Sequence, residues 1–577
     1  MESTIISHTQ SERVDDLPLI IYWLKQMNLD TIIDQKLPPP HGNRKGLTYG
    51  QLAILLLTYI LSEADHRLCC VEQWVNQHHR TLQSITEWNI GNKDATDDRC
   101  GDLLATLGNT PENIAQMQIS LGQHLIRAYQ LPTDKARSDT TSFSVHHRYC
   151  ENNDESSLIK FGYSKDKRPD LQQYRQMLAT LDPNGIPLVG ITLAGNGTDE
   201  RDYLPTWKQM KKIIGHSDFL YLADSKASTW YNRAQIDELG GIYCFPLAMS
   251  KPRPKLLSDW ISNPPNEIIK IKQQGEKESE KQEQEIGEGF EIPLGSIWRQ
   301  TETQKCYQWL ERWLVIKSNK LAHRQIKSLH SRLEKAEEKL AKLSQRPGNE
   351  ENVLRQKVEE IIKKYGMSKY IEYSINKKIS YEKVYRGQGR RTDSSSYKRV
   401  RKTKLIFSYE TSQEQIDSFE EMAGWRLYVT NAKKDKLSLT QAVESYKEQW
   451  QPEQGFHRLK KGRLSALPIY FRDENKIRGL MFLLTIGLRV LTLMEFVVRG
   501  ELKKSKSSLD GLYEGNRKRK TNRPTAEKLL RAFCNMTLYI HRDGTREISQ
   551  LNEIQKKILN LMKIPESIYQ NLFLAPS

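Results

Sequence analysis

The sequence predicts a multidomain α+β protein, with a helical N-terminal part followed by a mixed sheet that has helices packed on its faces. Three observations lead to this prediction. The chain has 577 residues, which is too long for one hydrophobic core. Hydrophobic residues make up 37% and charged residues 28%, so the chain can bury ordinary cores. The spacing of the apolar residues changes from helical to strand-like near residue 135.

The N-terminal part is expected to be all-helical. Residues 1–130 hold apolar runs such as LPLIIYWLKQM and QLAILLLTYIL, and few stretches that alternate as a strand does. The segment PPPHGN at 38–43 breaks the first helix from the second. We therefore predict a separate helical domain here.

A mixed sheet is predicted to follow. The apolar segments 175–181 and 186–194 flank Asp182-Pro183-Asn184-Gly185, a strong turn signal between two strands. A helical pattern at 204–214 precedes the short strand FLYLA at 219–223, and then come another helix and the strand IYCFPLAM. This order of elements is typical of a sheet with helices on its faces.

An insertion is expected to interrupt this sheet and to lie outside it. Residues 274–286 are almost purely charged and polar, as in a linker or an exposed loop. Apolar residues from Ile326 to Leu343 then repeat at steps of three and four, which predicts one arm of a helical hairpin. The expected parts are the N-terminal domain (1–130), the first part of the sheet domain (131–250), the insertion (251–425), the second part of the sheet domain (426–498), and a basic segment with a helical tail (499–577).

The charge balance favours a polyanionic partner. Lys and Arg number 88 against 71 for Asp and Glu, a formal net charge of +17. Two stretches concentrate this charge, residues 386–404 and residues 499–523. The first stretch contains Arg390 and Arg391, which we interpret as DNA-contacting, although a disordered surface loop is an equally good interpretation.

Nothing in the sequence indicates a secreted or membrane protein. The seven cysteines form no C-x-x-C pair, which argues against a zinc module and fits a reducing compartment. The N-terminus has no basic stretch followed by an apolar core. The apolar run 477–498 is long enough to cross a bilayer, but it carries Arg478, Arg489 and Glu495 and is interpreted as a buried helix. We expect no membrane partner and a cytoplasmic, nucleoid-associated location.

Three carboxylates are candidates for catalysis. Asp139 lies in RSDTTS, Asp224 ends the strand FLYLA, and Glu453 lies in a stretch rich in basic residues. Taken singly, each has a simpler explanation, a helix cap for the two aspartates and a solvated helix face for the glutamate. Together they form the set of hard oxygen ligands that Mg²⁺ or Mn²⁺ prefers. Two such ions can activate an attacking water or 3′-hydroxyl and stabilise the departing oxygen of a phosphodiester.

The residues around these carboxylates resemble a known family. The last motif of one class of DDE transposases of bacterial insertion sequences, Y-x2-R-x3-E-x6-K, maps onto Tyr446, Gln449, Glu453 and Lys460. The stretch FGYSKDKRPDL after Asp139 and the stretch GNGT before Asp224 are also similar to this class. The resemblance extends over nearly the whole chain.

The resemblance implies an RNase H-like catalytic core that holds two Mg²⁺ or Mn²⁺ ions. Asp139 would lie on its first strand, Asp224 on its fourth, and Glu453 on a helix after the large insertion. The partners would be double-stranded DNA, namely terminal inverted repeats and target DNA, bridged by a homodimer. The N-terminal helices would bind DNA ends. The residues expected to contact DNA near the cleaved phosphate or elsewhere are Tyr446, Gln449, Lys460, Lys461, Arg390 and Arg391.

Two residues depart from the family pattern. Gln449 stands where the family usually has Arg, so a phosphate clamp at this position is weakened or moved, for example to Lys447. Pro452 directly precedes Glu453, so either the helix is kinked there or it begins there. Two alternatives therefore stay open: a metal-dependent nuclease of the same fold, and a catalytically decayed DNA-binding relative.

Overall fold

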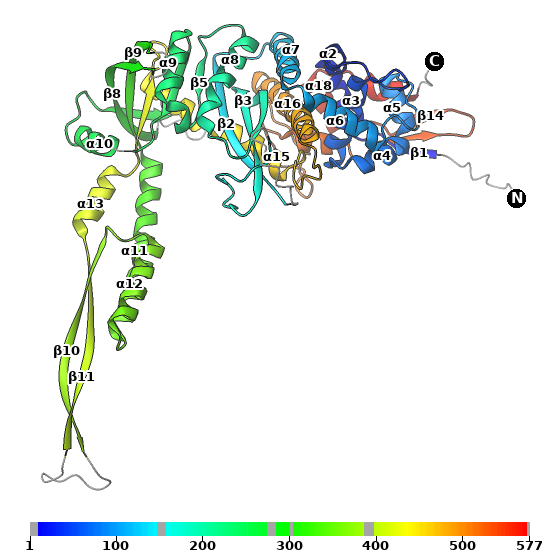
Figure 1. Cartoon of the computed structure of the whole chain (residues 1–577). Coiled ribbons are helices and arrows are strands. Elements are labelled where there is room, and N and C mark those ends of the chain that lie inside the picture. Colours follow the sequence, from blue (N-terminus) through cyan, green and yellow to red (C-terminus); the bar gives the residue numbers. More distant parts are fainter. Residues whose placement is uncertain are drawn as a thin grey trace.

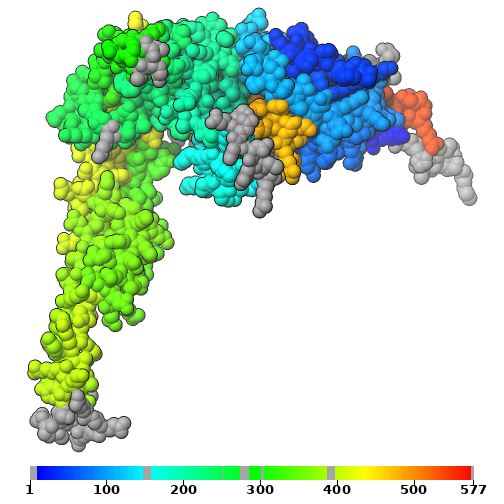
Figure 2. Space-filling model, viewed as in Figure 1, coloured from blue at the N-terminus to red at the C-terminus, as the bar shows by residue number. Residues whose placement is uncertain are grey.

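The chain forms an elongated body from which a long arm projects at an angle (Figures 1 and 2). The computed structural model describes residues 10–146, 157–250, 252–273, 284–300, 304–385 and 397–573. A sheet of nine strands and the helices around it form the body, together with the N-terminal and C-terminal helices.

The sheet is mixed, in agreement with the expectation of a multidomain α+β protein. Its strand order is β4-β3-β2-β5-β6-β12-β9-β8-β7. β2 pairs with β3 in antiparallel fashion and with β5 in parallel fashion, and β5 is parallel to β6. The strand bounds are β2 Lys135–Val145, β3 Gln172–Leu181, β4 Ile186–Ala194, β5 Leu220–Leu222, β6 Ile242–Pro246, β7 Ile269–Gln273, β8 Gln284–Arg299, β9 Cys306–Ser318 and β12 Trp425–Thr430.

Both faces of this sheet are covered. Alternate residues of β5 point to opposite sides, because the side chains of a strand alternate. Leu220 and Leu222 join one hydrophobic cluster with Leu439 of α14, whereas Tyr221 joins the main core with Trp207 of α8. The helices next to the sheet are α8 Tyr203–Ile214, α9 Trp230–Glu238, α10 Arg253–Ser262, α14 Leu439–Lys447 and α15 Trp450–Lys461.

The insertion is not wholly outside the sheet, so that prediction is wrong in part. β7, β8 and β9 lie between residues 250 and 425, yet they are hydrogen-bonded into the sheet beyond β12. Their pairing with β12 extends the sheet by three strands. Only residues 319–422 stand apart from it, as two helices, a two-stranded ribbon and a short helix.

The N-terminal helices share one hydrophobic core with the sheet. A single cluster contains Leu57 of the helical part, Leu178 and Leu188 of the sheet, and Leu559 near the C-terminus. The N-terminal part is also not entirely helical, since β1 pairs with a strand near the C-terminus. The bounds are β1 Gln10–Arg13, α1 Leu17–Gln26, α2 Leu29–Lys36, α3 Tyr49–Glu63, α4 Val71–Gln77, α5 His79–Thr86, α6 Asp97–Asn109 and α7 Pro111–Tyr129.

The C-terminal tail is likewise a mixture of helix and strand rather than helical alone. β13 pairs with both β1 and β14. This three-stranded sheet joins the first and last parts of the chain at one end of the body (Figure 1). The bounds are α17 Ala526–Arg531, β13 Thr537–Ile540, β14 Arg546–Ile548, α18 Glu553–Met562 and α19 Ser567–Gln570.

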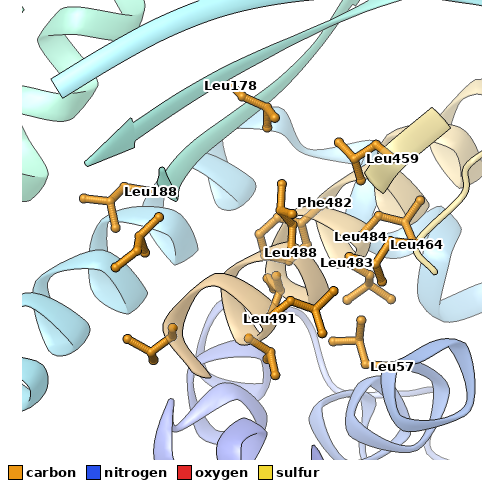
Figure 3. Packing of buried hydrophobic residues seen from close by; sticks show 14 of the residues in the cluster. Leu57, Leu178, Leu188, Leu459, Leu464, Phe482, Leu483, Leu484, Leu488 and Leu491 are labelled. Atoms are coloured by element: carbon orange, nitrogen blue, oxygen red, sulfur yellow. The ribbon is translucent and has the colours of Figure 1, made fainter. Parts of the chain in front are cut away.

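One long helix, α16 (Glu474–Lys504), runs through the middle of the body. Its Phe482, Leu484, Leu488 and Leu491 pack between the sheet and the N-terminal helices (Figure 3). By length and composition α16 could cross a membrane, but 89% of its apolar window is buried inside the protein. The buried Arg489 donates hydrogen bonds to two backbone carbonyls of β4, which satisfies part of the guanidinium within the core.

The arm consists of a helical hairpin that supports a ribbon. The predicted hairpin is present as α11 (Asn319–Gln345) and α12 (Glu351–Tyr365). The ribbon strands β10 (Ile371–Tyr385) and β11 (Tyr397–Thr411) form their own two-stranded sheet, and α13 (Gln413–Met422) returns the chain to the body. Figure 1 shows the ribbon extending well past the ends of both helices.

Candidate active site

Strand register places the two candidate aspartates side by side. β2 and β5 are parallel neighbours, and Arg137 is the Cα partner of Leu222. Asp139 and Asp224 lie two residues further along each strand direction, so they are level at the edge where β5 ends. Adjacent strands lie about 4.8 Å apart, so the register alone brings the two carboxylates to one place.

Asp224 is held in position by two donors. Its side chain caps the 3-10 turn Ser225–Ser228 by accepting a hydrogen bond from the Lys226 backbone N–H at 2.9 Å. The Tyr203 hydroxyl of α8 donates to Asp224 Oδ1 at 2.8 Å. Asp224 therefore does cap the turn that follows its strand, with both hydrogen bonds to Oδ1, and its charge also acts on Asp139.

The pKa of Asp139 is affected by the other two candidate carboxylates. Its pKa is raised to about 6, chiefly by burial and in smaller part by the nearby carboxylates of Asp224 and Glu453. Lys165 and the Thr140 backbone N–H, which donates to Asp139 Oδ1 at 2.7 Å, act in the opposite direction. Asp139 therefore interacts electrostatically with both of the other predicted carboxylates.

Glu453 is exposed in the first turn of α15, and this helix packs against β2. The helix begins at Trp450, after a break from α14 at Glu448 and Gln449. Pro452 therefore lies in the first turn, where its missing N–H costs no hydrogen bond. The question of a kink or a helix start at Pro452 is thus answered in favour of a start. A carboxylate is also favoured near a helix N-terminus by the helix dipole.

A buried ion pair fixes α15 on the body. Arg458, five residues beyond Glu453, is paired with Glu495 of α16, and with Glu527 of α17 at 2.8 Å. The Glu495 carboxylate also accepts from the Ala526 backbone N–H at 2.9 Å and pairs with Arg499 at 3.1 Å. The helix that carries Glu453 is therefore anchored through its last turn, while Glu453 in its first turn lies close enough to act on the charge of Asp139.

The donor set fits a divalent cation, although the side chains are not gathered into a finished metal site. Among the described residues, no group of three or more His, Cys, Asp or Glu side chains is close enough to hold a metal ion. The raised pKa of Asp139 reflects chiefly the burial of its carboxyl and, to a smaller degree, the charges of Asp224 and Glu453, and a hard cation would favour the ionised form. Convergence of Asp139, Asp224 and Glu453 on bound metal stays a prediction.

A cationic network that the sequence interpretation missed borders the two aspartates. Lys165 donates to the Thr140 hydroxyl at 3.0 Å and pairs with Asp199 at 3.3 Å, and Lys226 pairs with Asp199 at 3.2 Å. Burial tends to raise the pKa of Asp199, but Lys165, Arg175 and Lys226 lower it to about 2. Lys165 lies in FGYSKD and Asp199 directly follows GNGT, so the two quoted motifs were the signal for this network.

The predicted DNA-contacting residues are placed differently from one another. Lys460 donates to both oxygens of Asp166, at 2.9 and 3.0 Å, and lies over the Phe143 ring at 5.5 Å. Tyr446 packs edge-on against Tyr428, and burial raises its pKa, with a smaller contribution from Asp224. Lys461 is exposed at the end of α15, whereas Arg390 and Arg391 lie outside the described residues.

The structure gives a reason for Gln449 in place of the usual Arg. Arg137 of β2 is fully buried and makes a two-pronged ion pair with Asp182, at 2.7 Å for both contacts. The same guanidinium donates to Gln449 Oε1 at 3.4 Å and pairs with Glu448 at 3.3 Å. An arginine at 449 would place a second cation against Arg137, which a neutral acceptor avoids.

Comparison with known proteins identifies only the N-terminal part. Residues 9–117 match a domain of unknown function, DUF4277. The matched region covers α1 to α6 and part of α7, and it contains none of the three candidate carboxylates. No curated protein matches the chain.

Proposed function

We propose that the chain is a transposase that cleaves DNA at the ends of an insertion sequence and joins the 3′-hydroxyl to target DNA by two-metal phosphoryl transfer. The observation that carries the proposal is the level placement of Asp139 and Asp224 on parallel strands, with Glu453 close enough to raise the pKa of Asp139. This arrangement is consistent with an RNase H-like core, because Asp139 lies on the first strand of the sheet and Asp224 at the end of the fourth.

Each carboxylate has a role in this proposal. Asp139, Asp224 and Glu453 would hold two Mg²⁺ or Mn²⁺ ions, which when bound supply positive charge at the attacking and departing oxygens. Lys165 and Lys226, already beside the aspartates, would hold the DNA backbone in line. A water oxygen then attacks the phosphorus and the 3′-oxygen leaves; that 3′-hydroxyl later attacks a target phosphodiester.

The proposal includes the partners. The net charge of +17 suits double-stranded DNA, namely terminal inverted repeats and target DNA. A homodimer bridging two ends and a cytoplasmic, nucleoid-associated location follow from the resemblance to insertion-sequence transposases. The N-terminal helices and the basic segment 499–523 would hold the ends.

The test replaces each carboxylate separately. We expect Asp139→Ala, Asp224→Ala and Glu453→Ala to abolish Mg²⁺-dependent cleavage of the element's own end, because each removes a metal ligand, while binding of the end changes little. Cleavage on labelled end DNA and gel-shift binding in EDTA measure the two properties. Loss of binding with the folded state intact, or cleavage that survives any one change, would refute the assignment.

A second assay separates the proposal from its alternatives. A pre-cleaved end with a free 3′-hydroxyl is incubated with a circular target plasmid. A transposase produces joined products, a nuclease of the same fold produces only hydrolysis, and a decayed relative produces neither although it binds the end.

A further inference from the structure

The outer half of the arm is a ribbon without a core of its own. The base of the ribbon is covered, since Ile371, Leu405 and Phe407 pack with Leu340 and Val358 of the helical hairpin. This cover ends near Lys377, which pairs with Glu351 at the start of α12 at 2.7 Å. Beyond that point, residues 376–384 and 397–404 are all exposed.

Several of these exposed residues are large and apolar. Ile379 is 46% exposed and Tyr381 is 67% exposed. An isolated two-stranded ribbon is marginally stable in water, and exposed apolar side chains on it mark a binding surface. We therefore expect a binding partner to cover the exposed apolar side chains of the outer half of the ribbon.

Charge decides which kind of partner fits. The exposed strand segments carry one acidic residue, Glu382, which pairs with Lys402. A second copy of the ribbon is excluded as the partner, because it would bring like charges together. The partner that these positive charges favour is a polyanion. The basic residues of these segments are Lys377, Lys378, Lys383, Lys398, Arg399, Arg401, Lys402 and Lys404.

The two faces of the ribbon differ in chemistry. The register pairs Tyr381 with Arg401 and Lys383 with Arg399, so these residues share one face. This face is the outward continuation of the face that packs on the helical hairpin, because Ile371 and Ile375 lie an even number of residues away on the same strand. Lys378, Lys398 and Lys404 lie on the opposite face, together with Ser380 and Glu382.

We propose that the Tyr/Arg face of the outer ribbon, formed by Tyr381, Lys383, Arg399 and Arg401, binds duplex DNA away from the cleaved bond. The proposal rests on the proposed function for the presence of DNA, but the binding itself requires no metal. The major groove of DNA is wide enough for a two-stranded ribbon. The planar guanidinium group of arginine can donate two hydrogen bonds to the oxygens of one phosphate. The exposed segment 376–384 spans about 30 Å, or just under one turn of B-DNA.

The ribbon gives the protein a second hold on DNA, independent of the active site. Its contacts are chiefly with phosphates, so they add affinity that is strongly salt-dependent and indifferent to sequence. Exposed tyrosines between the cations add contacts with sugars or bases.

The test uses the full-length protein and a 40-base-pair duplex of arbitrary sequence in EDTA, so that cleavage is impossible. Binding is measured by fluorescence anisotropy over a range of salt concentrations. The variant K383Q/R399Q/R401Q removes three cations from the Tyr/Arg face. The matched variant K378Q/K398Q/K404Q removes three from the opposite face. Thermal unfolding of both variants verifies that the fold is unchanged.

We expect the Tyr/Arg-face variant to lose at least tenfold in affinity at moderate salt, and its salt slope to fall by about two to three units. The opposite-face variant should lose less than threefold. Equal losses in the two variants would overturn the assignment of the face, and no loss in either would overturn DNA as the ribbon's partner. The proposed function is judged separately, because wild-type protein that binds through the ribbon yet never cuts an element end refutes cleavage alone.

Discussion

Asp139 is half-buried on β2, and this burial together with the charges of Asp224 and Glu453 makes the ionised form of its carboxyl unfavourable. With a pKa of about 6 in the folded protein, against 3.8 as the ordinary value, the carboxyl is protonated in weak acid and ionised at neutral pH. The raised pKa means that its contribution to stability is complete below pH 3.8 and is lost as the pH rises through 6. A bound cation would reverse this penalty.

Asp139→Asn should therefore raise the melting temperature of the metal-free protein at pH 8, and by about half as much at pH 5, which lies between the unfolded and folded pKa values. Asparagine keeps the shape without the charge, so the gain in the free energy of unfolding is at most about 3 kcal/mol. Differential scanning calorimetry in EDTA at both pH values measures it, with Asp435→Asn, an exposed position, as the control. An equal gain at both pH values, or a loss at pH 8, would show that the charge of Asp139 is already compensated.

Residue-level prediction from the sequence succeeded where a side chain lies at a strand end and failed where its partner is distant. The run FLYLA placed Asp224 at the end of a short strand, as the structure has it. Nothing near Gln449 in the sequence reveals Arg137, because the two meet only after β2 and the start of α15 come together. Lys460 shows the same limit, since its partner Asp166 belongs to the loop after β2.

At the scale of elements, α15 decides whether Glu453 can reach the aspartates. Its first turn holds Pro452 without losing a backbone hydrogen bond, and its last turn is anchored by Arg458. The anchor is buried, so removing Arg458 leaves the buried Glu495 charge with Arg499 as its remaining cationic partner. The position of Glu453 thus depends on an ion pair between three helices.

Arg458→Met should lower the free energy of unfolding by about 3 kcal/mol, because Glu495 then stays buried with only Arg499 beside it and Glu527 also loses Arg458. The double variant Arg458→Met/Glu495→Leu should recover part of this loss, since the buried charge of Glu495 is removed as well. Chemical denaturation with urea measures both. A loss that the double variant does not reduce would mean that packing, rather than the ion pair, holds α15.

The helical hairpin could be predicted because its pattern is local. The apolar repeat from Ile326 to Leu343 predicted the helix that the structure has as α11. The position of β8 and β9 in the main sheet could not be predicted in this way. Strand alternation indicates which residues are buried but not which strand is the neighbour. β9 pairs with β12, and the whole arm lies between these two strands in the sequence.

At the scale of the whole molecule, one hydrophobic core joins parts that the sequence pattern separates. Leu57 and Leu488 are both in the main cluster, although they belong to the N-terminal helices and to α16 (Figure 3). The apolar runs predicted burial correctly, but they carry no information on what covers them. The DUF4277 region, residues 9–117, is therefore built into the body that carries the candidate site.

The central claim is that Asp139, Asp224 and Glu453 hold divalent metal at a DNA phosphate. Anomalous diffraction from crystals of the protein bound to its own end DNA and Mn²⁺ tests it most directly. We expect anomalous peaks in contact with carboxylate oxygens of all three residues and with the phosphate at the cleavage site. Peaks in contact with Asp139 and Asp224 but not with Glu453, or a DNA phosphate held elsewhere on the body, would contradict it.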